Sequence, residues 1–200
     1  MAVTQEQFNE GLTYQQYMDQ ITQNKDRFIE NGEKAELTPE DIAAFKNLPE
    51  PLNVLVIGED WCGDVVAGLP VLNKLAEAVG TLNVRIFLRD QNEDLMNQYL
   101  KEGQFKSIPV VVFFDQKMHE LGHFIERPAA QTAESAVARN AFFAAHPEYN
   151  APQNADFGAL SPEARQAWGT ESTKMRAERT SAWNQMLVDE FKKIVNGVPA

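Results

Sequence analysis

The amino-acid sequence predicts an α/β protein with a central mixed sheet of about four strands flanked by helices. Short apolar runs typical of buried strands alternate with longer segments of helical periodicity, which predicts parallel pairing through right-handed crossovers. Two further apolar runs are separated only by a tight turn, which predicts an antiparallel pair. The predicted strands cover residues 52–58, 83–88, 110–114 and 119–125, and the helices between them cover residues 64–79 and 93–101.

Additional helices are predicted before the first strand. Thr13 and Gln16 have the spacing of a capping box, and apolar side chains then recur at helical spacing. Gly32 has the position of a C-terminal glycine, so we expect one amphipathic helix over residues 13–31. A Thr-Pro-Glu-Asp run starts a second, short helix that is predicted to cover residues 38–47.

The sequence after the last strand predicts a third helical region. Residues 129–145 are rich in alanine, a strong helix former. Residues 146–160 contain several proline, asparagine and glycine residues and read as a linker, and Ser161 then starts another helix. That helix carries an apolar stripe at helical spacing, formed by Met175, Ala182, Met186 or Leu187, Phe191 and Ile194.

On this interpretation the chain has three parts. Residues 1–48 form an N-terminal helical segment that packs on the core, residues 49–146 form the α/β domain, and residues 147–200 form a linker and a C-terminal helix. The apolar stripes on the outer helices predict that these helices pack either on the core or on a second copy of the chain, as a homodimer.

Composition narrows the class of protein. A formal net charge of −11 disfavours binding to nucleic acid or to anionic membranes. No run approaches the roughly 18 apolar residues that a membrane span needs. The single cysteine excludes an intramolecular disulfide framework and favours a reducing compartment. Residues 1–10 lack the features of a signal peptide, so we expect a cytoplasmic protein.

That single cysteine, Cys62, lies where a predicted buried strand gives way to a predicted helix. The positive end of a helix dipole favours a thiolate at this position. The carboxylates of Glu59, Asp60 and Asp64 act in the opposite direction if they lie close. The sequence therefore marks Cys62 as a candidate nucleophile and leaves open whether its pKa is lowered. The alternative is an inert thiol that serves as a small apolar residue.

Several landmarks follow one another along the chain: Trp61-Cys62-Gly63, Pro70 within the following helix, Ser107-Ile108-Pro109 before a strand, Gly122, and Glu126-Arg127-Pro128. In this order they resemble the thioredoxin family. The chain is similar to a bacterial thioredoxin-like group with a Trp-Cys-x-Asp motif and a Glu-Arg-Pro motif after the last strand, and the resemblance covers about residues 40–145. The resemblance implies a thioredoxin-like fold for residues 49–146.

The resemblance also implies a site around Cys62. Pro109 would be cis and would place the Ile108 backbone opposite the thiol for pairing with an extended peptide; a trans proline opening an edge strand is the alternative. Trp61 is expected either to flank the thiol as an exposed platform or to pack in the core. Gly63 and Asp64 complete the motif as candidate substrate-binding residues.

Arg127 is a further candidate substrate-binding residue. Its guanidinium would neutralise Asp64, stabilise a thiolate or hold a ligand carboxylate. The alternative is an ordinary surface salt bridge, which contributes little.

Two departures from the thioredoxin pattern determine the expected activity. The second cysteine is replaced by Val65, and the buried carboxylate before the motif is replaced by Val56. We therefore expect a monothiol thiol–disulfide oxidoreductase that acts on a protein disulfide or low-molecular-weight thiol and needs an external resolving thiol. The alternative is a redox-inactive module that binds a peptide or partner protein.

No cofactor and no metal site are expected. His119 and His123 fall on a predicted strand, where four residues span about 13 Å, and no third ligand is near them in sequence.

Overall fold

The computed structural model describes residues 3–155 and 157–197. The first two residues of the expected N-terminal segment and the last three of the expected C-terminal segment lie outside these ranges. The chain divides into two compact units. The first contains the described residues up to Arg127 together with those from Leu187 onward, and the second is Pro128–Met186. The sequence-based division into three parts, with boundaries at residues 48 and 146, does not coincide with these two units.

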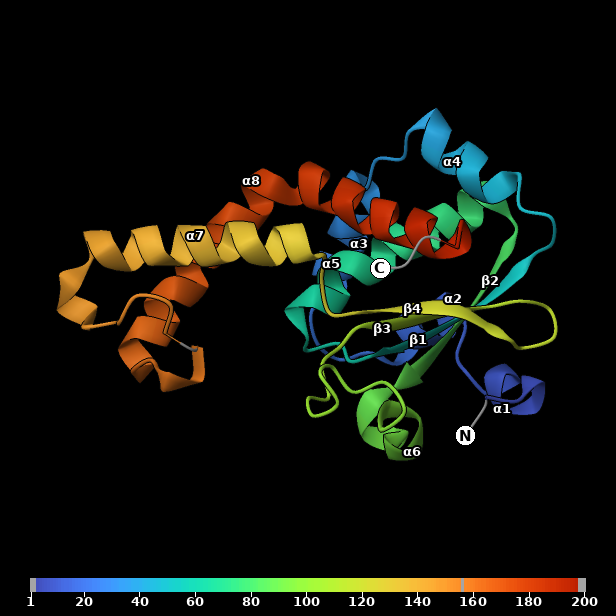
Figure 1. Ribbon diagram of the computed structural model, residues 1–200, viewed down its shortest axis with the longest axis horizontal. Coiled ribbons are helices and arrows are strands. Elements are labelled where there is room, and N and C mark those ends of the chain that lie inside the picture. Colours follow the sequence, from blue (N-terminus) through green and yellow to red (C-terminus); the bar gives the residue numbers. More distant parts are fainter. Residues whose placement is uncertain (1–2, 156, 198–200) are drawn as a thin grey trace. The chain divides into compact units, whose positions relative to one another are not determined.

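A four-stranded mixed sheet forms the centre of the first unit (Figure 1). The spatial order is β2-β1-β3-β4. β1 pairs with β2 in parallel and with β3 antiparallel, and β3 pairs antiparallel with β4. The predicted α/β class and mixed thioredoxin-like sheet are therefore confirmed. The strands are β1 (Leu52–Gly58), β2 (Leu82–Leu88), β3 (Val110–Phe114) and β4 (Glu120–Ile125).

The helix after β1 is α5 (Gly63–Val79), and it contains Pro70. A proline has no N–H to donate, so the carbonyl four residues earlier loses its helical partner. That carbonyl belongs to Val66, and the side-chain amide of Asn31 donates to it at 2.8 Å. Asn31 lies on α3 (Lys25–Lys34), so this hydrogen bond also fixes α3 against α5.

The single helix predicted over residues 13–31 is wrong, because the chain forms two helices there. α2 (Tyr14–Gln20) has the predicted capping box between Thr13 and Gln16, and α3 starts only at Lys25. Between them, the backbone N–H groups of Thr22 and Gln23 both donate to the Asp60 carboxylate, at 2.8 and 2.9 Å. A helix through this point would use those N–H groups internally. Gly32 lies inside α3 and does not end it.

The helix predicted over residues 93–101 is shorter than expected. α6 (Glu93–Met96) ends after one turn, and the next residues form turns with bonds to the third residue back. The buried Tyr99 follows, and its hydroxyl bonds Glu120 on β4 at 3.2 Å. The remaining short elements of this unit are α1 (Gln5–Asn9), α4 (Pro39–Lys46) and the 3₁₀ turn Arg89–Gln91.

The last turns of α8 (Pro162–Val195) complete the core of the first unit. Phe191 is 1% exposed and packs against Phe113 of β3 and Phe124 of β4, with ring centroids 5.5 and 5.7 Å away. A Cβ atom added at Gly122 would lie 3.1 Å from Ile194, so glycine on β4 permits this close approach. The predicted C-terminal stripe is thus core in its last part.

The second unit contains α7 (Ala129–Ala145) and about the first three-quarters of α8. Ser161 caps α8 as predicted, because its hydroxyl accepts from the Ala164 N–H at 3.1 Å. Glu134 on α7 pairs with Arg179 on α8 at 2.8 Å and accepts from the Trp183 indole at the same distance. The linker between the helices contains two 3₁₀ turns, Pro147–Tyr149 and Phe157–Ala159.

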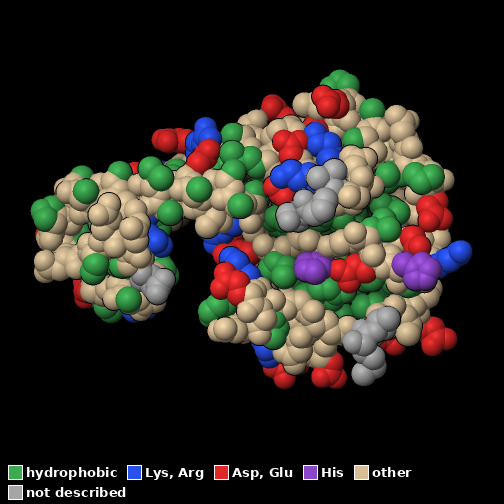
Figure 2. Space-filling model, viewed as in Figure 1, with side chains coloured by type: hydrophobic (Ala, Val, Ile, Leu, Met, Phe, Trp, Pro, Cys, Tyr) green, Lys and Arg blue, Asp and Glu red, His purple; other side chains and the backbone are tan. Residues whose placement is uncertain are grey.

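Charged side chains are widely distributed over the protein. Acidic and basic groups lie interspersed on the face shown in Figure 2. Within residues 3–155 and 157–197, the structure has no helix with the length and apolar character that a bilayer crossing requires.

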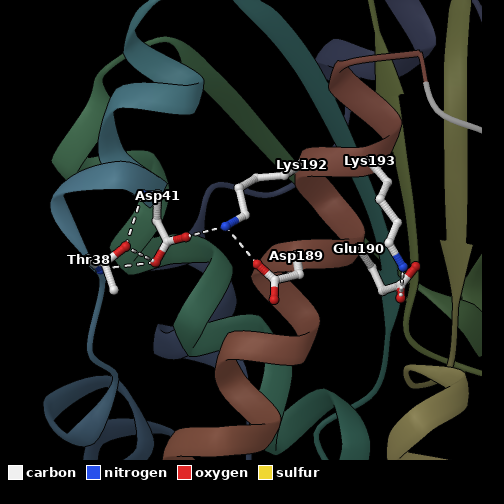
Figure 3. Close-up of polar contacts among 6 residues, drawn as sticks. All are labelled: Thr38, Asp41, Asp189, Glu190, Lys192 and Lys193. Carbon is white, nitrogen blue, oxygen red and sulfur yellow. Dashed lines mark hydrogen bonds and ion pairs between the residues drawn. The ribbon is translucent and has the colours of Figure 1, made fainter.

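A buried ion pair fastens the end of α8 to α4 (Figure 3). Asp41 is fully buried, and its carboxylate completes a capping box with Thr38. Lys192 reaches Asp41 at 2.7 Å and Asp189 at 2.6 Å. The neighbouring Lys193 pairs instead with Glu190 and is half-exposed. The two lysines thus offer a matched comparison of a buried and a surface pair.

We predict that Lys192→Met lowers the free energy of unfolding by about 2–3 kcal/mol, because it leaves the Asp41 carboxylate buried without its cation. The value lies below that for a fully buried pair because Lys192 keeps partial exposure. Lys193→Met should change the free energy by no more than about 0.5 kcal/mol. Urea denaturation of both variants measures the difference, and equal losses would contradict this role of Asp41.

Candidate functional site

The site is centred on Cys62, the N-cap residue of α5. The thiol is half-buried, and its Sγ lies 3.4 Å from the carbonyl oxygen of Ile108, to which it donates. The Ile108–Pro109 peptide bond is cis, and both residues are buried just before β3. The structure therefore brings together the three residues that the sequence placed at the centre of the site.

The surroundings of Cys62 favour its protonated thiol over the thiolate. Burial is the largest influence and raises the pKa of Cys62. The backbone N–H groups of Val65 and Asp64 at the start of α5 act in the opposite direction, as does the charge of Arg127, whereas the Asp64 carboxylate adds to the rise. The sequence left open whether the helix N-terminus lowers the pKa of Cys62 or the nearby acids raise it. In the structure, burial has the largest effect and raises it.

Arg127 lies at this site and pairs with Asp64. Its Nη2 atom lies 2.8 Å from Asp64 Oδ2 and 2.8 Å from Glu126 Oε1. Lys101 pairs with the same Glu126 at 2.6 Å. The side chain of Asp64 is 11% exposed, so this contact is better shielded from water than a surface pair. Arg127 therefore offsets the charge of Asp64 beside the thiol.

The turn before Cys62 is held from two sides. Asp60 accepts the N–H groups of Thr22 and Gln23 through its carboxylate, and its carbonyl accepts from the Asn24 side chain at 2.8 Å. On the other side, Glu59 accepts the N–H of Asp90 at 2.9 Å, and burial raises the pKa of Glu59. These contacts fix the turn that presents the thiol.

Trp61 and Gly63 flank the thiol in sequence. Trp61 is 43% exposed, and the guanidinium carbon of Arg89 lies 4.7 Å from its ring centroid. This is the geometry of a cation–π contact. Gly63 is the first residue of α5, and a Cβ atom there would meet nothing within 4 Å.

Both positions that depart from the thioredoxin pattern are fully buried. Val56 lies on β1 and Val65 on α5, each with no exposed surface. A Cβ atom at Gly58 would lie 3.0 Å from Val65 Cγ1, so the valine fills the space beside the strand end. Neither a second thiol nor a carboxylate is available at these positions.

The sequence pattern places Tyr17 only among the apolar side chains that recur at helical spacing over residues 13–31. In the structure its side chain is fully buried, its hydroxyl has no hydrogen-bond partner among the described residues, and burial raises the pKa of Tyr17. No local pattern distinguishes it from a core tyrosine. The role of Asp60 was also missed, because its partners lie far away in sequence.

Comparison with known families and structures agrees with the fold. A family model described as thioredoxin matches residues 11–139. A protein of unknown function from Pseudomonas aeruginosa is 17% identical, with a TM-score of 0.68, over 98% of this chain and 99% of that chain. An HIV epitope scaffold is 16% identical, with a TM-score of 0.66, over 97% and 98% of the two chains. These likenesses concern the fold.

Two curated relatives are described as AAA ATPases forming ring-shaped complexes. The one from Corynebacterium diphtheriae is 26% identical over 102 residues, which are 44% of this chain and 20% of that protein. The one from Corynebacterium glutamicum strain R is 31% identical over 94 residues, which are 40% and 18% of the two chains. The matched segment thus spans about a fifth of each relative.

We predict opposite effects for the two charges beside the thiol. Asp64→Asn should lower the pKa of Cys62, and Arg127→Met should raise it, each by about one pH unit, because one charge disfavours the thiolate and the other favours it. The rate of Cys62 alkylation against pH measures both. Glu30→Gln, which removes an exposed carboxylate on α3, is the control and should leave the midpoint unchanged. Shifts of the same sign in both site variants would contradict this electrostatic arrangement.

Proposed function

Because the chain belongs to the thioredoxin family, we propose that it is a monothiol thiol–disulfide oxidoreductase whose nucleophile is Cys62. The observation that carries the proposal is the position of the thiol. Cys62 is the N-cap residue of α5, and its Sγ lies 3.4 Å from the carbonyl oxygen of Ile108, the residue before the buried Pro109. An extended peptide that pairs with the Ile108 backbone brings its own disulfide next to this sulfur.

The proposed reaction has two exchanges. Cys62 attacks one sulfur of a substrate disulfide, so that a new S–S bond forms, the old one breaks, and the released sulfur leaves as a thiol with the proton that Cys62 gave up. An external thiolate then attacks the substrate sulfur of the mixed disulfide and restores Cys62. Because Val65 stands where a resolving cysteine would be, this second thiol comes from outside, as a low-molecular-weight thiol of the cytoplasm or from another protein.

The raised pKa of Cys62 suits a thiol that is masked at rest. At rest the thiol donates its hydrogen to the carbonyl of Ile108. A peptide N–H that bonds the same carbonyl would replace the thiol as donor. The sulfur then remains beside the backbone N–H groups of Asp64 and Val65 at the start of α5, which favour its charged form. In this proposal, substrate binding and activation of the nucleophile are one event.

The flanking residues have distinct proposed roles. Arg127 offsets the Asp64 carboxylate and thereby limits its effect on the developing thiolate. Trp61 is a platform for the substrate chain, since it is exposed and is held by Arg89. Gly63 leaves open space beside the thiol. The relatives described as ATPases do not change this proposal, because the sequence lacks a phosphate-binding Gly-x-x-x-x-Gly-Lys-Ser/Thr loop.

A redox-inactive binding module is the second candidate function. It is favoured by the raised pKa of Cys62 and by the two buried valines, Val56 and Val65, which remove parts of the usual dithiol machinery. In that case Ile108 and Trp61 bind a peptide and Cys62 takes no part in turnover.

Trapping of the mixed disulfide distinguishes the two candidates. We predict that the wild type reacts with a peptide disulfide to form a mixed disulfide at Cys62 that persists until an external thiol is added. Intact-protein mass spectrometry follows its formation and release, with Cys62→Ser as the blank. If folded wild type forms no mixed disulfide, the binding module becomes the better proposal.

Val65→Cys tests the missing resolving thiol in the same assay. This variant should release the bound peptide without any added thiol, by forming an intramolecular disulfide. Val65→Ser is the matched control, since it has a similar size and no thiol, and should behave like the wild type.

A further inference from the structure

Arg89 lies in the 3₁₀ turn after β2, and its guanidinium contacts three separate groups. The Nε and Nη2 atoms lie 2.8 and 2.7 Å from Asp90 Oδ1. Nη1 donates to the backbone carbonyl of Lys106 at 3.5 Å, and the guanidinium carbon lies 4.7 Å from the centre of the Trp61 ring. A guanidinium is planar and has several fixed donors, so it can stack on a ring and bond at its edge at the same time.

Two of these contacts belong to the two segments that form the site. Trp61 directly precedes Cys62, and Lys106 lies two residues before Ile108. The same segments are joined a second time, because the Cys62 thiol donates to the Ile108 carbonyl at 3.4 Å. Arg89 therefore forms a second link between the segments that the thiol joins at the centre of the site.

The backbone around Arg89 is itself anchored. The N–H of Asp90 donates to the Glu59 carboxylate at 2.9 Å, and the side-chain amide of Asn92 donates to the Leu88 carbonyl at 2.8 Å. The guanidinium is thus presented from a fixed turn, and the Asp90 carboxylate sets its direction further. The side chain of Arg89 is 23% exposed, which shields its contacts in part from water.

The Trp61 side chain still has surface available to a ligand. It is 43% exposed, although the guanidinium of Arg89 lies over its ring. A large side chain that is held in one orientation before binding loses less conformational entropy when a ligand packs on it. Without Arg89 the indole would have to be ordered by the ligand, and the ligand would bind more weakly.

We propose that Arg89 is a positioning residue that makes this site selective for disulfides carried in an extended peptide chain, because it holds the Trp61 indole beside the segment of Ile108. This inference rests on the proposed function and names its substrate class. A peptide that pairs with the Ile108 backbone and packs on the indole uses both linked segments. A small disulfide needs only the sulfur of Cys62 and gains nothing from the link.

Arg89→Met is the direct test, since it keeps an aliphatic chain and removes the cation and its donors. The probes are the disulfide of the peptide Ala-Val-Phe-Cys-Val-Ala and the disulfide of 2-mercaptoethanol. Intact-protein mass spectrometry follows the adduct at Cys62. The rate with the peptide should fall about five-fold, because the indole is no longer held. The rate with the small disulfide should stay unchanged.

Two further variants identify the cause of the loss. Arg89→Lys keeps the positive charge but lacks the planar group that stacks and bonds together, so it should lose most of the same rate. Arg176→Met is the matched control, because Arg176 also lies over a tryptophan ring, that of Trp183 at 5.6 Å, and makes none of the contacts described at the site. It should leave both rates unchanged.

An unchanged peptide rate in Arg89→Met would overturn the proposal. Equal losses with the two disulfides would also overturn it, since that result is expected if Arg89 only maintains the fold. A full peptide rate in Arg89→Lys would assign the effect to charge alone and contradict the positioning role.

A binding measurement separates this inference from the proposed function. The probe is the same peptide with serine in place of cysteine and a fluorescent label, added to Cys62→Ser protein with and without Arg89→Met. Arg89→Met should weaken binding about five-fold, even if the wild type forms no mixed disulfide and the oxidoreductase function fails. Equal binding by both proteins, or binding by neither, would overturn the inference.

Discussion

The structure depends most on the turn of residues 59–64, which joins β1 to α5. Four segments that are distant in sequence each bind one residue of this turn. Asp60 is bound by the link between α2 and α3, Glu59 by the segment after β2, Cys62 by the residue before Pro109, and Asp64 by Arg127 after β4. The chain has no second cysteine that could influence Cys62. The reactivity of this thiol therefore depends on the tertiary contacts that hold the turn.

The same turn explains how the N-terminal helices contribute to the site. Their break at residues 21–24 supplies N–H groups to Asp60, and Asn31 satisfies the carbonyl that Pro70 leaves unpaired in α5. These helices therefore support the helix that follows Cys62 both at its start and at the turn that contains Pro70. The core of the first unit is completed by the end of α8. In the sequence, the second unit lies between β4 and these last turns.

Local sequence rules predicted what is determined locally. The Thr13 capping box, the start of α8 after Ser161 and the four strands follow from capping and periodicity, and the ordered motifs identified Cys62, Pro109 and Arg127. The single helix over residues 13–31 failed because the Asp60 carboxylate competes for its N–H groups, and no local pattern contains that interaction. The predicted length of α6 was wrong for a similar reason, since Tyr99 forms a hydrogen bond with Glu120 on β4.

The direction of the pKa shift of Cys62 could not be predicted from the sequence, for a different reason. The motif fixed which charges lie near Cys62, but the sign of its pKa shift follows from burial, which only the packed structure defines. Tyr17 shows the same limit. Its spacing marks a core position, and only the packed structure shows that its buried hydroxyl has no hydrogen-bond partner among the described residues.

The most direct measurement is the rate of exchange of Cys62 with a disulfide carried in an extended peptide, compared with the same disulfide in a small molecule. Both rates are taken for the folded protein and for the protein unfolded in urea. If peptide binding at Ile108 unmasks the thiol, folding should increase the ratio of the peptide rate to the small-molecule rate. A ratio that is the same in the folded and unfolded protein would contradict a thiol activated by its substrate.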